Sequence, residues 1–178
     1  MTLQQGDHWF WTPGSSLHTL SELATFYHRS VGANGHLEID FAIDRTGNVA
    51  PTHVAAYAAF GAWIAGCYKK APLASASLAA GAASVTLPLP AGAQPDRVVL
   101  REDQTGGQFV ITYTVEVQAG GGAWAPFSAG TTIGSNRIDV AAAPVAATAL
   151  RLTIVSAFSP GHAGVHIDVL DGAGCATQ

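Results

Sequence analysis

Charged residues are scarce in this chain of 178 residues, and their shortage excludes one class of protein at once. Lys, Arg, Asp and Glu make up 11% of the sequence, the formal net charge is −4, and no run of basic residues occurs. A surface that binds nucleic acid through its phosphates needs clustered Lys and Arg side chains. We therefore expect no nucleic-acid partner.

Long apolar runs and an export signal are also missing. No stretch of about 18 consecutive apolar residues occurs, so we expect no membrane-spanning helix and no membrane partner. The first residues, MTLQQGDHWFW, contain neither a basic n-region nor an apolar core, so no signal peptide is expected. These observations leave the compartment unknown.

Potential metal ligands and cysteines are few. His162 and His166 have a spacing found in some metal sites, but zinc needs three or four ligands and no third is in view. We therefore expect no metal and no cofactor. Cys67 and Cys175 form no CxxC pair, and spacing alone does not report whether two thiols meet. A disulfide between them stays open, although two lone thiols are the favoured interpretation.

The first seventy residues predict two helices. Thr19 to Glu22 (TLSE) form a capping box at the start of the first helix, and VGANG at 31–35 ends it. Pro51 suits the first turn of the second helix. Apolar residues recur at helical spacing in both. They are Leu20, Leu23, Ala24 and Tyr27 in the first helix, and Val54, Tyr57, Ala58, Gly61 and Ile64 in the second.

A strand is expected between these helices, at residues 37–43. Its side chains alternate, so Leu37, Ile39 and Phe41 face one way while Glu38 and Asp40 face the other. A strand between two helices is typical of a parallel βα unit, and polar residues on its second face suit the lumen of a (β/α)8 barrel. Such a barrel needs about 250 residues. Residues 1–70 therefore predict only a partial barrel, whose other strands this sequence does not encode.

Beyond residue 70 the hydrophobic period changes to two. KKAPLASASLAAG at 69–81 is interpreted as a linker, and seven or eight short alternating runs follow, separated by Gly, Pro and Asp. Such a series favours an antiparallel β-sandwich or jelly roll. The predicted fold class is α+β. It combines a helix-strand-helix piece of a TIM-type barrel at 1–70 with a β-sandwich domain at 71–178.

Several motifs, in this order, resemble family 29 glycoside hydrolases, the α-L-fucosidases. They are WFWTPG at 9–14, the run from Leu20 to Pro51, YAAFGAWI at 57–64, the run at 98–117, GTTIGSNRID at 130–139 and ALRLTIVSA at 149–157. The resemblance covers nearly all of residues 8–171. It implies the end of the catalytic barrel and the C-terminal, discoidin-like sandwich of a retaining hydrolase that acts on fucosylated glycans. It also implies that Trp9 and Trp11 line the fucose pocket.

The catalytic residues of that family have no counterpart here. The family's nucleophile and acid/base would lie upstream of Met1, and retaining chemistry needs two carboxylates about 5–5.5 Å apart. Asp40 and Asp44 are the only candidates at the rim, and neither occupies a family catalytic position. Asp44 to Gly47 (DRTG) is better explained as a turn. No catalytic residue is therefore predicted, and the isolated chain is expected to be inactive.

The resemblance implies a fucosylated glycan as ligand, bound weakly or not at all by this chain alone, and a second chain that supplies the rest of the barrel. Members of the family are typically lysosomal or secreted. An alternative function is a catalytically inactive carbohydrate-binding or scaffolding module that uses the sandwich. Four polar residues of the sandwich could grip a sugar or dock the sandwich onto the barrel, and docking is favoured. They are Glu102, Asp103, Gln108 and Arg137.

Overall fold

The chain consists of two compact units in the computed structural model, which describes residues 1–6, 8–158 and 161–177. The helical unit contains Met1–Ser30, His36–Lys70 and Ala173–Gln178. The sandwich unit contains Val31–Gly35 and Ala71–Gly172. Each unit has its own apolar core.

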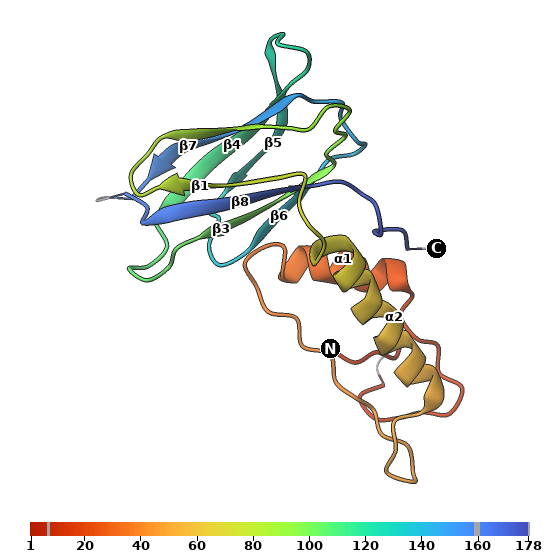
Figure 1. Cartoon of the computed structure of the whole chain (residues 1–178). Helices are drawn as coiled ribbons and strands as arrows, with labels where there is room; N and C mark the ends of the chain where they lie inside the picture. The colour runs from red at the N-terminus through yellow and green to blue at the C-terminus, as the bar shows by residue number, and fades with distance from the viewer. Residues whose placement is uncertain (7, 159–160, 178) are drawn as a thin grey trace. The chain divides into compact units, whose positions relative to one another are not determined.

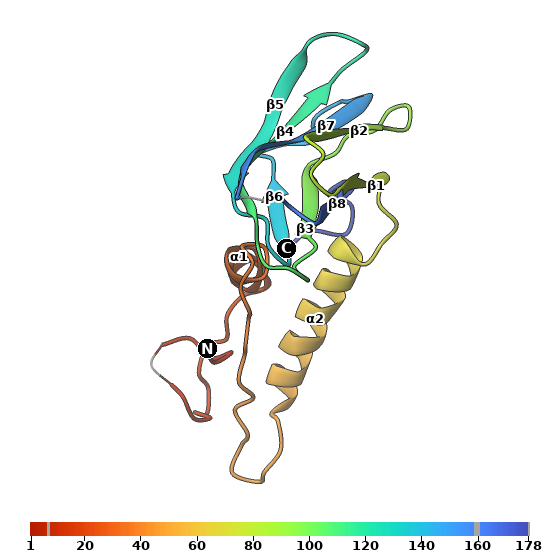
Figure 2. The ribbon, with the colours of Figure 1, turned by 90° about the vertical axis from the view of Figure 1, so that its left-hand side faces the viewer.

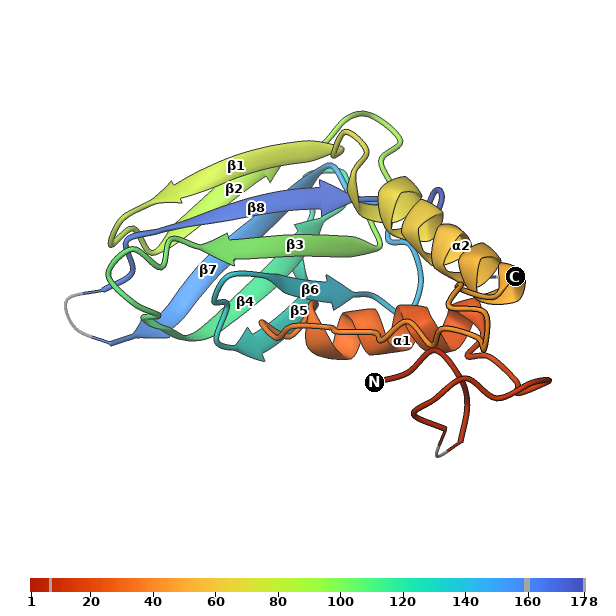
Figure 3. The same cartoon turned by 90° about the horizontal axis from the view of Figure 1, so that it is seen from below.

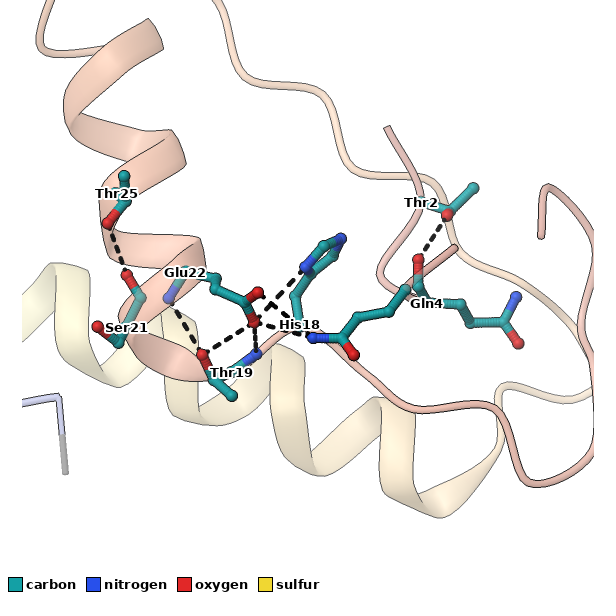
Figure 4. A network of polar contacts seen from close by, with 8 residues as sticks. Thr2, Gln4, His18, Thr19, Ser21, Glu22 and Thr25 are labelled. Carbon is teal, nitrogen blue, oxygen red and sulfur yellow. Dashed lines mark hydrogen bonds and ion pairs between the residues drawn. The ribbon is translucent and has the colours of Figure 1, made fainter. Parts of the chain in front are cut away.

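The helices of the helical unit begin where the sequence predicts. Helix α1 (Leu20–Ser30) is preceded by the capping box, in which Thr19 N donates to Glu22 Oε2 (2.8 Å) and Glu22 N donates to Thr19 Oγ1 (3.2 Å; Figure 4). Helix α2 (Pro51–Tyr68) starts at its proline. The two helices cross steeply (Figure 2). No helix in the described part of the chain is long and apolar enough to cross a membrane.

The buried face of α2 differs from the predicted one. His53, Phe60, Trp63 and Cys67 point into the core, whereas Val54 is 52% exposed. Ala58 and Gly61 are exposed as well. Tyr57 and Ile64 of the predicted face do pack against the core, so the prediction was wrong in part. Helix α2 is apolar on nearly every side, and its hydrophobic period therefore does not select a face. In α1, which has a polar side, the predicted Leu23 and Ala24 are buried.

The strand predicted at residues 37–43 is not a regular strand. This segment is extended and forms isolated bridges, a parallel one between Thr2 and Asp40 and an antiparallel one between Ile43 and Val49. A strand needs a ladder of backbone partners. Here the bonds from Met1 N to Glu38 O (3.0 Å) and from Asp40 N to Met1 O (2.8 Å) accompany the parallel bridge.

The side chains of this segment alternate only in part as predicted. Leu37 and Ile39 pack against the core of the helical unit, and Glu38 and Asp40 are exposed. Phe41 is 58% exposed. Its predicted orientation toward a helix holds all the same, because its ring stacks on Tyr57 of α2 with centroids 4.0 Å apart.

The cysteines form a disulfide, which corrects the favoured interpretation of two lone thiols. Cys67 at the end of α2 is joined to Cys175, with 4.8 Å between the Cα atoms and a sequence separation of 108. Trp63 Nε1 donates to Cys175 O (3.1 Å), and Lys70 Nζ donates to Ala173 O (2.7 Å). Tertiary folding thus brings together two residues whose proximity no local pattern could report.

The sandwich unit has two four-stranded antiparallel sheets (Figures 1 and 3). The first contains, in spatial order, β1 (Ala74–Ala79), β8 (Gly164–Leu170), β3 (Arg97–Glu102) and β6 (Arg137–Val140). The second contains β2 (Ser84–Pro88), β7 (Ala149–Ala157), β4 (Val110–Gln118) and β5 (Trp124–Thr131). Alternate residues of both sheets fill a common core, and Leu100, Val115 and Leu152 are fully buried there.

Strand β1 corrects the predicted linker. It lies within 69–81 and pairs with β8 from Ala74 opposite Val169 to Ala79 opposite Gly164. Its sequence, ASASLA, consists mostly of small residues with low strand propensity. Pairing with β8, rather than local preference, makes this segment a strand. The other seven strands coincide with predicted alternating runs.

Candidate functional site

An exposed aromatic loop is the most prominent feature of the helical unit. Trp9 is 69% exposed and Phe10 is 86% exposed, although burying such side chains is strongly favourable in water. Trp11 is partly exposed. Adjacent aromatic residues held open to solvent are typical of a ligand or partner surface.

The side chain of Gln4 holds this loop in place. Gln4 is 1% exposed, and its Nε2 donates to Phe10 O (3.0 Å). Its Oε1 accepts hydrogen bonds from Thr12 N (3.0 Å) and Ser15 Oγ (2.6 Å). Its backbone carbonyl accepts from Thr2 Oγ1 (3.1 Å; Figure 4). A buried amide with satisfied donors and acceptors is costly to disturb, so Gln4 fixes how the loop presents its rings.

The aromatic loop and the extended segment line one groove of about 400 Å³. The structure therefore brings Trp9 and Trp11 together with Phe41 and Asp44, which lie more than 29 residues further along the sequence. The full lining consists of Trp9, Phe10, Trp11, Phe41, Ala42, Ile43, Asp44 and Arg45. Several ring faces in a concave site suit the apolar face of a small ligand such as a sugar.

The Asp44 carboxylate is part of a turn, as predicted. Its Oδ1 accepts hydrogen bonds from Thr46 N (2.8 Å), Thr46 Oγ1 (2.6 Å) and Asn48 N (3.1 Å). The hydroxyl of Thr46 and the backbone N–H groups of Asn48 and Thr46 hold the pKa of Asp44 below its usual range. The side chain is therefore ionised and engaged at neutral pH. It is unsuited to act as an acid in the groove.

Asp40 does not complete a carboxylate pair in this groove. It is not among the lining residues, and its Oδ2 lies 4.0 Å from the amino group of Met1. Among the residues that the structure describes, the groove thus contains one carboxylate. A retaining glycosidase site needs two.

The four polar residues of the sandwich have partners within the sandwich unit. Glu102 is 5% exposed, and its Oε1 accepts from Phe109 N (2.8 Å) and Val110 N (2.9 Å). Asp103 accepts hydrogen bonds from Thr105 N (2.9 Å) and Thr105 Oγ1. Glu102 and Asp103 therefore stabilise the loop after β3.

Gln108 and Arg137 meet the segment 31–35 that follows α1. Gln108 Oε1 accepts from Asn34 Nδ2 (3.0 Å), and Asn34 Oδ1 accepts from Ser135 N (2.7 Å). Arg137 forms a bridge with Ala33, and its Nε donates to Asp139 Oδ1 (2.7 Å). These contacts hold segment 31–35 within the sandwich unit. Docking of the sandwich onto a barrel stays a prediction.

The close contact between Asn34 and Gly134 defines this attachment. Asn34 has a positive φ of 64°, and a Cβ placed on Gly134 would lie 2.1 Å from Asn34 Nδ2. Only glycine leaves room for the amide. The VGANG motif predicted the end of α1. No local signal indicated that its Asn would bind the loop at 132–136 through hydrogen bonds.

The two histidines of the predicted weak metal motif have separate partners. His162 is 4% exposed, and its Nε2 faces Ala82 O (2.9 Å). His166 contacts Ser77 and Asp168. No group of three His, Cys, Asp or Glu side chains that could hold a metal occurs in the described parts of the chain.

The fold and the groove define a class of protein in which a helical unit with an aromatic groove is linked to an antiparallel β-sandwich. No family model and no curated protein matches the sequence. Solved structures do match. A protein from Bacteroides thetaiotaomicron assigned as an α-L-fucosidase is 25% identical, with a TM-score of 0.85, over 94% of this chain and 39% of its own.

Two further structures are named as members of glycoside hydrolase family 29. One, from an unknown rumen bacterium, is 24% identical with a TM-score of 0.79, over 96% of this chain and 32% of its own. A Ruminococcus gnavus fucosidase, solved with fucose, is 20% identical with a TM-score of 0.82, over 96% of this chain and 40% of its own. The resemblance to family 29 α-L-fucosidases is thus confirmed, and the chain spans about two fifths or less of these structures.

Proposed function

We propose that this chain is the C-terminal portion of an α-L-fucosidase and contributes the aromatic wall of its fucose site. The groove that joins Trp9 and Trp11 to Phe41 carries this proposal, because stacked ring faces suit the apolar side of a sugar. The loop is held by Gln4, so the rings are ordered before any ligand binds. Such preorganisation lowers the cost of binding.

The helical unit is, in this proposal, the closing segment of a (β/α)8 barrel. Two observations support it. The parallel bridge between Thr2 and Asp40 is the pairing that adjacent barrel strands would make. Helix α2 exposes Val54, Ala58 and Gly61 although it is apolar on nearly every side. Further barrel elements, from the same protein or from a partner chain, would cover this surface.

The isolated 178-residue chain should not hydrolyse α-L-fucosides. A retaining mechanism requires a nucleophilic carboxylate and a second carboxyl group that acts as acid and base. Asp44, the carboxylate in the groove, is engaged in its own turn. The test is hydrolysis of an aryl α-L-fucoside by the purified chain. Saturable turnover that scales with protein concentration would contradict the proposal.

Complementation tests the barrel directly. The chain would be co-expressed with the barrel portion of the Ruminococcus gnavus fucosidase that lies outside the matched region. We expect hydrolysis of the aryl fucoside to appear only when both pieces are present. Trp9→Ala should lower that activity about fivefold, since a stacked aromatic contact contributes about 1 kcal/mol.

Phe158→Ala is the matched control for Trp9→Ala. Phe158 is an exposed aromatic residue (61%) of the sandwich unit and lies outside the groove. Phe158→Ala should change the complemented activity by less than about twofold relative to the unaltered chain. Equal losses in both variants would show that the groove has no special role. For the chain alone, free fucose should bind more weakly than 1 mM, because one stacked ring provides less than the roughly 4 kcal/mol that this affinity requires.

A further inference from the structure

Strand β1, which the sequence did not reveal, completes a polar cluster on the outer face of its sheet. Strands β1, β8 and β3 are neighbours, and Ser77, His166 and Arg101 lie in one register row across them. Ser75 and Asp168 occupy the adjacent row. Side chains two residues apart on a strand share a face, so all five side chains point the same way.

The hydrogen bonds of this cluster orient His166. Its Nε2 lies 3.0 Å from Asp168 Oδ1, and its Nδ1 lies 3.1 Å from Ser77 Oγ. A carboxylate accepts hydrogen bonds, so the arrangement places the ring proton on Nε2 and leaves Nδ1 as an acceptor for the Ser77 hydroxyl. The connectivity is therefore serine to imidazole to carboxylate.

Arg101 and Ser75 keep Asp168 in its charged form. Arg101 Nη1 donates to Asp168 Oδ2 (2.8 Å), and Ser75 Oγ donates to Asp168 Oδ1 (2.8 Å). Partial burial opposes ionisation, but these bonds and the one from His166 hold the pKa of Asp168 below its usual range. An ionised Asp168 stabilises the imidazolium that forms when His166 accepts a proton.

The cluster opens onto a groove of about 440 Å³. Ser77, Arg101 and His166 are among its lining residues, together with the backbone around Gly164. The side chain of Arg101 is 44% exposed, and Asp168 is its partner among the described residues. Its other guanidinium N–H groups can therefore donate to a ligand in the groove.

We propose that Ser77 is a nucleophile activated by His166, and that this groove accepts small acyl esters. A serine within hydrogen-bond reach of a base that a third group orients is the arrangement needed for covalent catalysis. This activity does not depend on the proposed fucosidase function, because it uses residues of the sandwich unit alone.

The reaction would proceed in two balanced steps. Ser77 Oγ attacks the ester carbonyl carbon and passes its proton to His166 Nδ1, while Arg101 stabilises the oxyanion. The bond to the leaving alcohol breaks, and the alcohol takes that proton, which leaves an acyl-serine. Water, deprotonated by His166, then attacks the acyl group, and the proton returns to Ser77 as the carboxylic acid departs.

The test uses p-nitrophenyl acetate with the full chain. We expect release of p-nitrophenol, together with one acetyl group on the peptide that contains Ser77, detected by mass spectrometry after acid quenching. Ser77→Ala should lower the rate about 100-fold and abolish the adduct. Ser84→Ala is the matched control: Ser84 is an exposed serine of β2 in the other sheet and is not among the residues that line this groove. It should change the rate less than about threefold.

Thermal unfolding midpoints would show that both serine variants remain folded. Absence of an adduct in the unaltered chain would overturn the proposal. So would an adduct that survives Ser77→Ala, because acylation would then occur elsewhere. An equal loss in Ser84→Ala would overturn the assignment of Ser77 as the nucleophile. Fucosidase activity after complementation would be unaffected by either serine variant, so the two proposals can fail separately.

Discussion

The sandwich unit leaves fewer of its large apolar side chains in solvent than the smaller helical unit does. In the sandwich, side chains of both sheets interdigitate, and Leu100, Val115 and Leu152 are fully buried. In the helical unit, Trp9, Phe10, Phe41, Ile43 and Val54 are each more than half exposed. A complete hydrophobic core makes one unit self-sufficient. The other has surfaces that need something to cover them.

Hydrogen exchange on the intact chain should give the largest difference between the units. Amides of β4 and β7 should exchange by global unfolding, because both strands are paired on each side. Amides of residues 37–43 should exchange at least about 1,000-fold faster, since the segment has isolated bridges only. Slow exchange in 37–43 of a monomer, matching β4, would contradict the comparison.

Loss of the disulfide should weaken the helical unit most. The bond between Cys67 and Cys175 closes a sequence separation of 108 residues, and the loop-entropy model assigns such a cross-link about 4–5 kcal/mol. We expect a reductant to lower the urea concentration at which half of the chain is unfolded. Circular dichroism at helix wavelengths would follow the unfolding. The double variant Cys67→Ser/Cys175→Ser is the control and should not respond to reductant. An unchanged midpoint in the native chain would show that the cross-link is dispensable.

Two glycine variants compare packing in the units. A Cβ on Gly130 of β5 would lie 2.6 Å from Tyr113 Oη, and that hydroxyl donates to Asp139 Oδ2 (2.7 Å) in the buried core. Gly130→Ala should therefore destabilise the chain by about 1–3 kcal/mol. An alanine methyl at Gly61 of α2 would meet no described atom within 4 Å outside its own helix turn, so Gly61→Ala should stabilise the chain by about 0.5–1 kcal/mol.

Denaturant unfolding of both glycine variants measures these effects. Opposite signs would support the contrast between a close-packed sandwich and an open face of α2. If Gly61→Ala instead destabilised the chain, that face of α2 would have to be covered in solution, for example by a second copy.

The capping box should contribute a smaller amount. Thr19→Ala removes the hydroxyl that accepts from Glu22 N and should cost about 1 kcal/mol of stability. Thr25→Ala is the control, because its hydroxyl bonds Ser21 O inside α1 and caps nothing. Equal unfolding midpoints for the two variants would contradict a capping role.

Acid should break the hydrogen bonds that the Glu22 carboxylate makes in the same capping box. Hydrogen bonds from the Thr19 backbone N–H and hydroxyl hold the pKa of Glu22 below its usual value of 4.5. A lowered pKa in the folded state means that the contribution is present above about pH 4.5 and is lost as the pH falls through the lower, folded value. Helicity of α1 should decrease in that acid range. Glu22→Gln should lack this part of the pH dependence.

Where local chemistry was sufficient, the sequence by itself determined the structure. Alternating apolar residues predicted the series of short strands beyond residue 70, and TLSE and Pro51 predicted where the two helices begin. These signals act over a few residues, through side-chain alternation, helix capping and the fixed φ of proline. The consecutive rings at 9–11 predicted a sugar-binding wall through the family resemblance, and the structure places them in one groove.

Only the tertiary structure decided features whose partners are distant in sequence. Strand β1 exists because β8 pairs with it, and that pairing brings Ser77 to His166. Phe41 joins Trp9 in one groove because the extended segment and the aromatic loop lie side by side in the helical unit. The buried face of α2 and the Cys67–Cys175 bond follow the same rule. Small residues, an all-apolar helix and two isolated thiols carry no directional signal, so packing and long-range pairing alone select their partners.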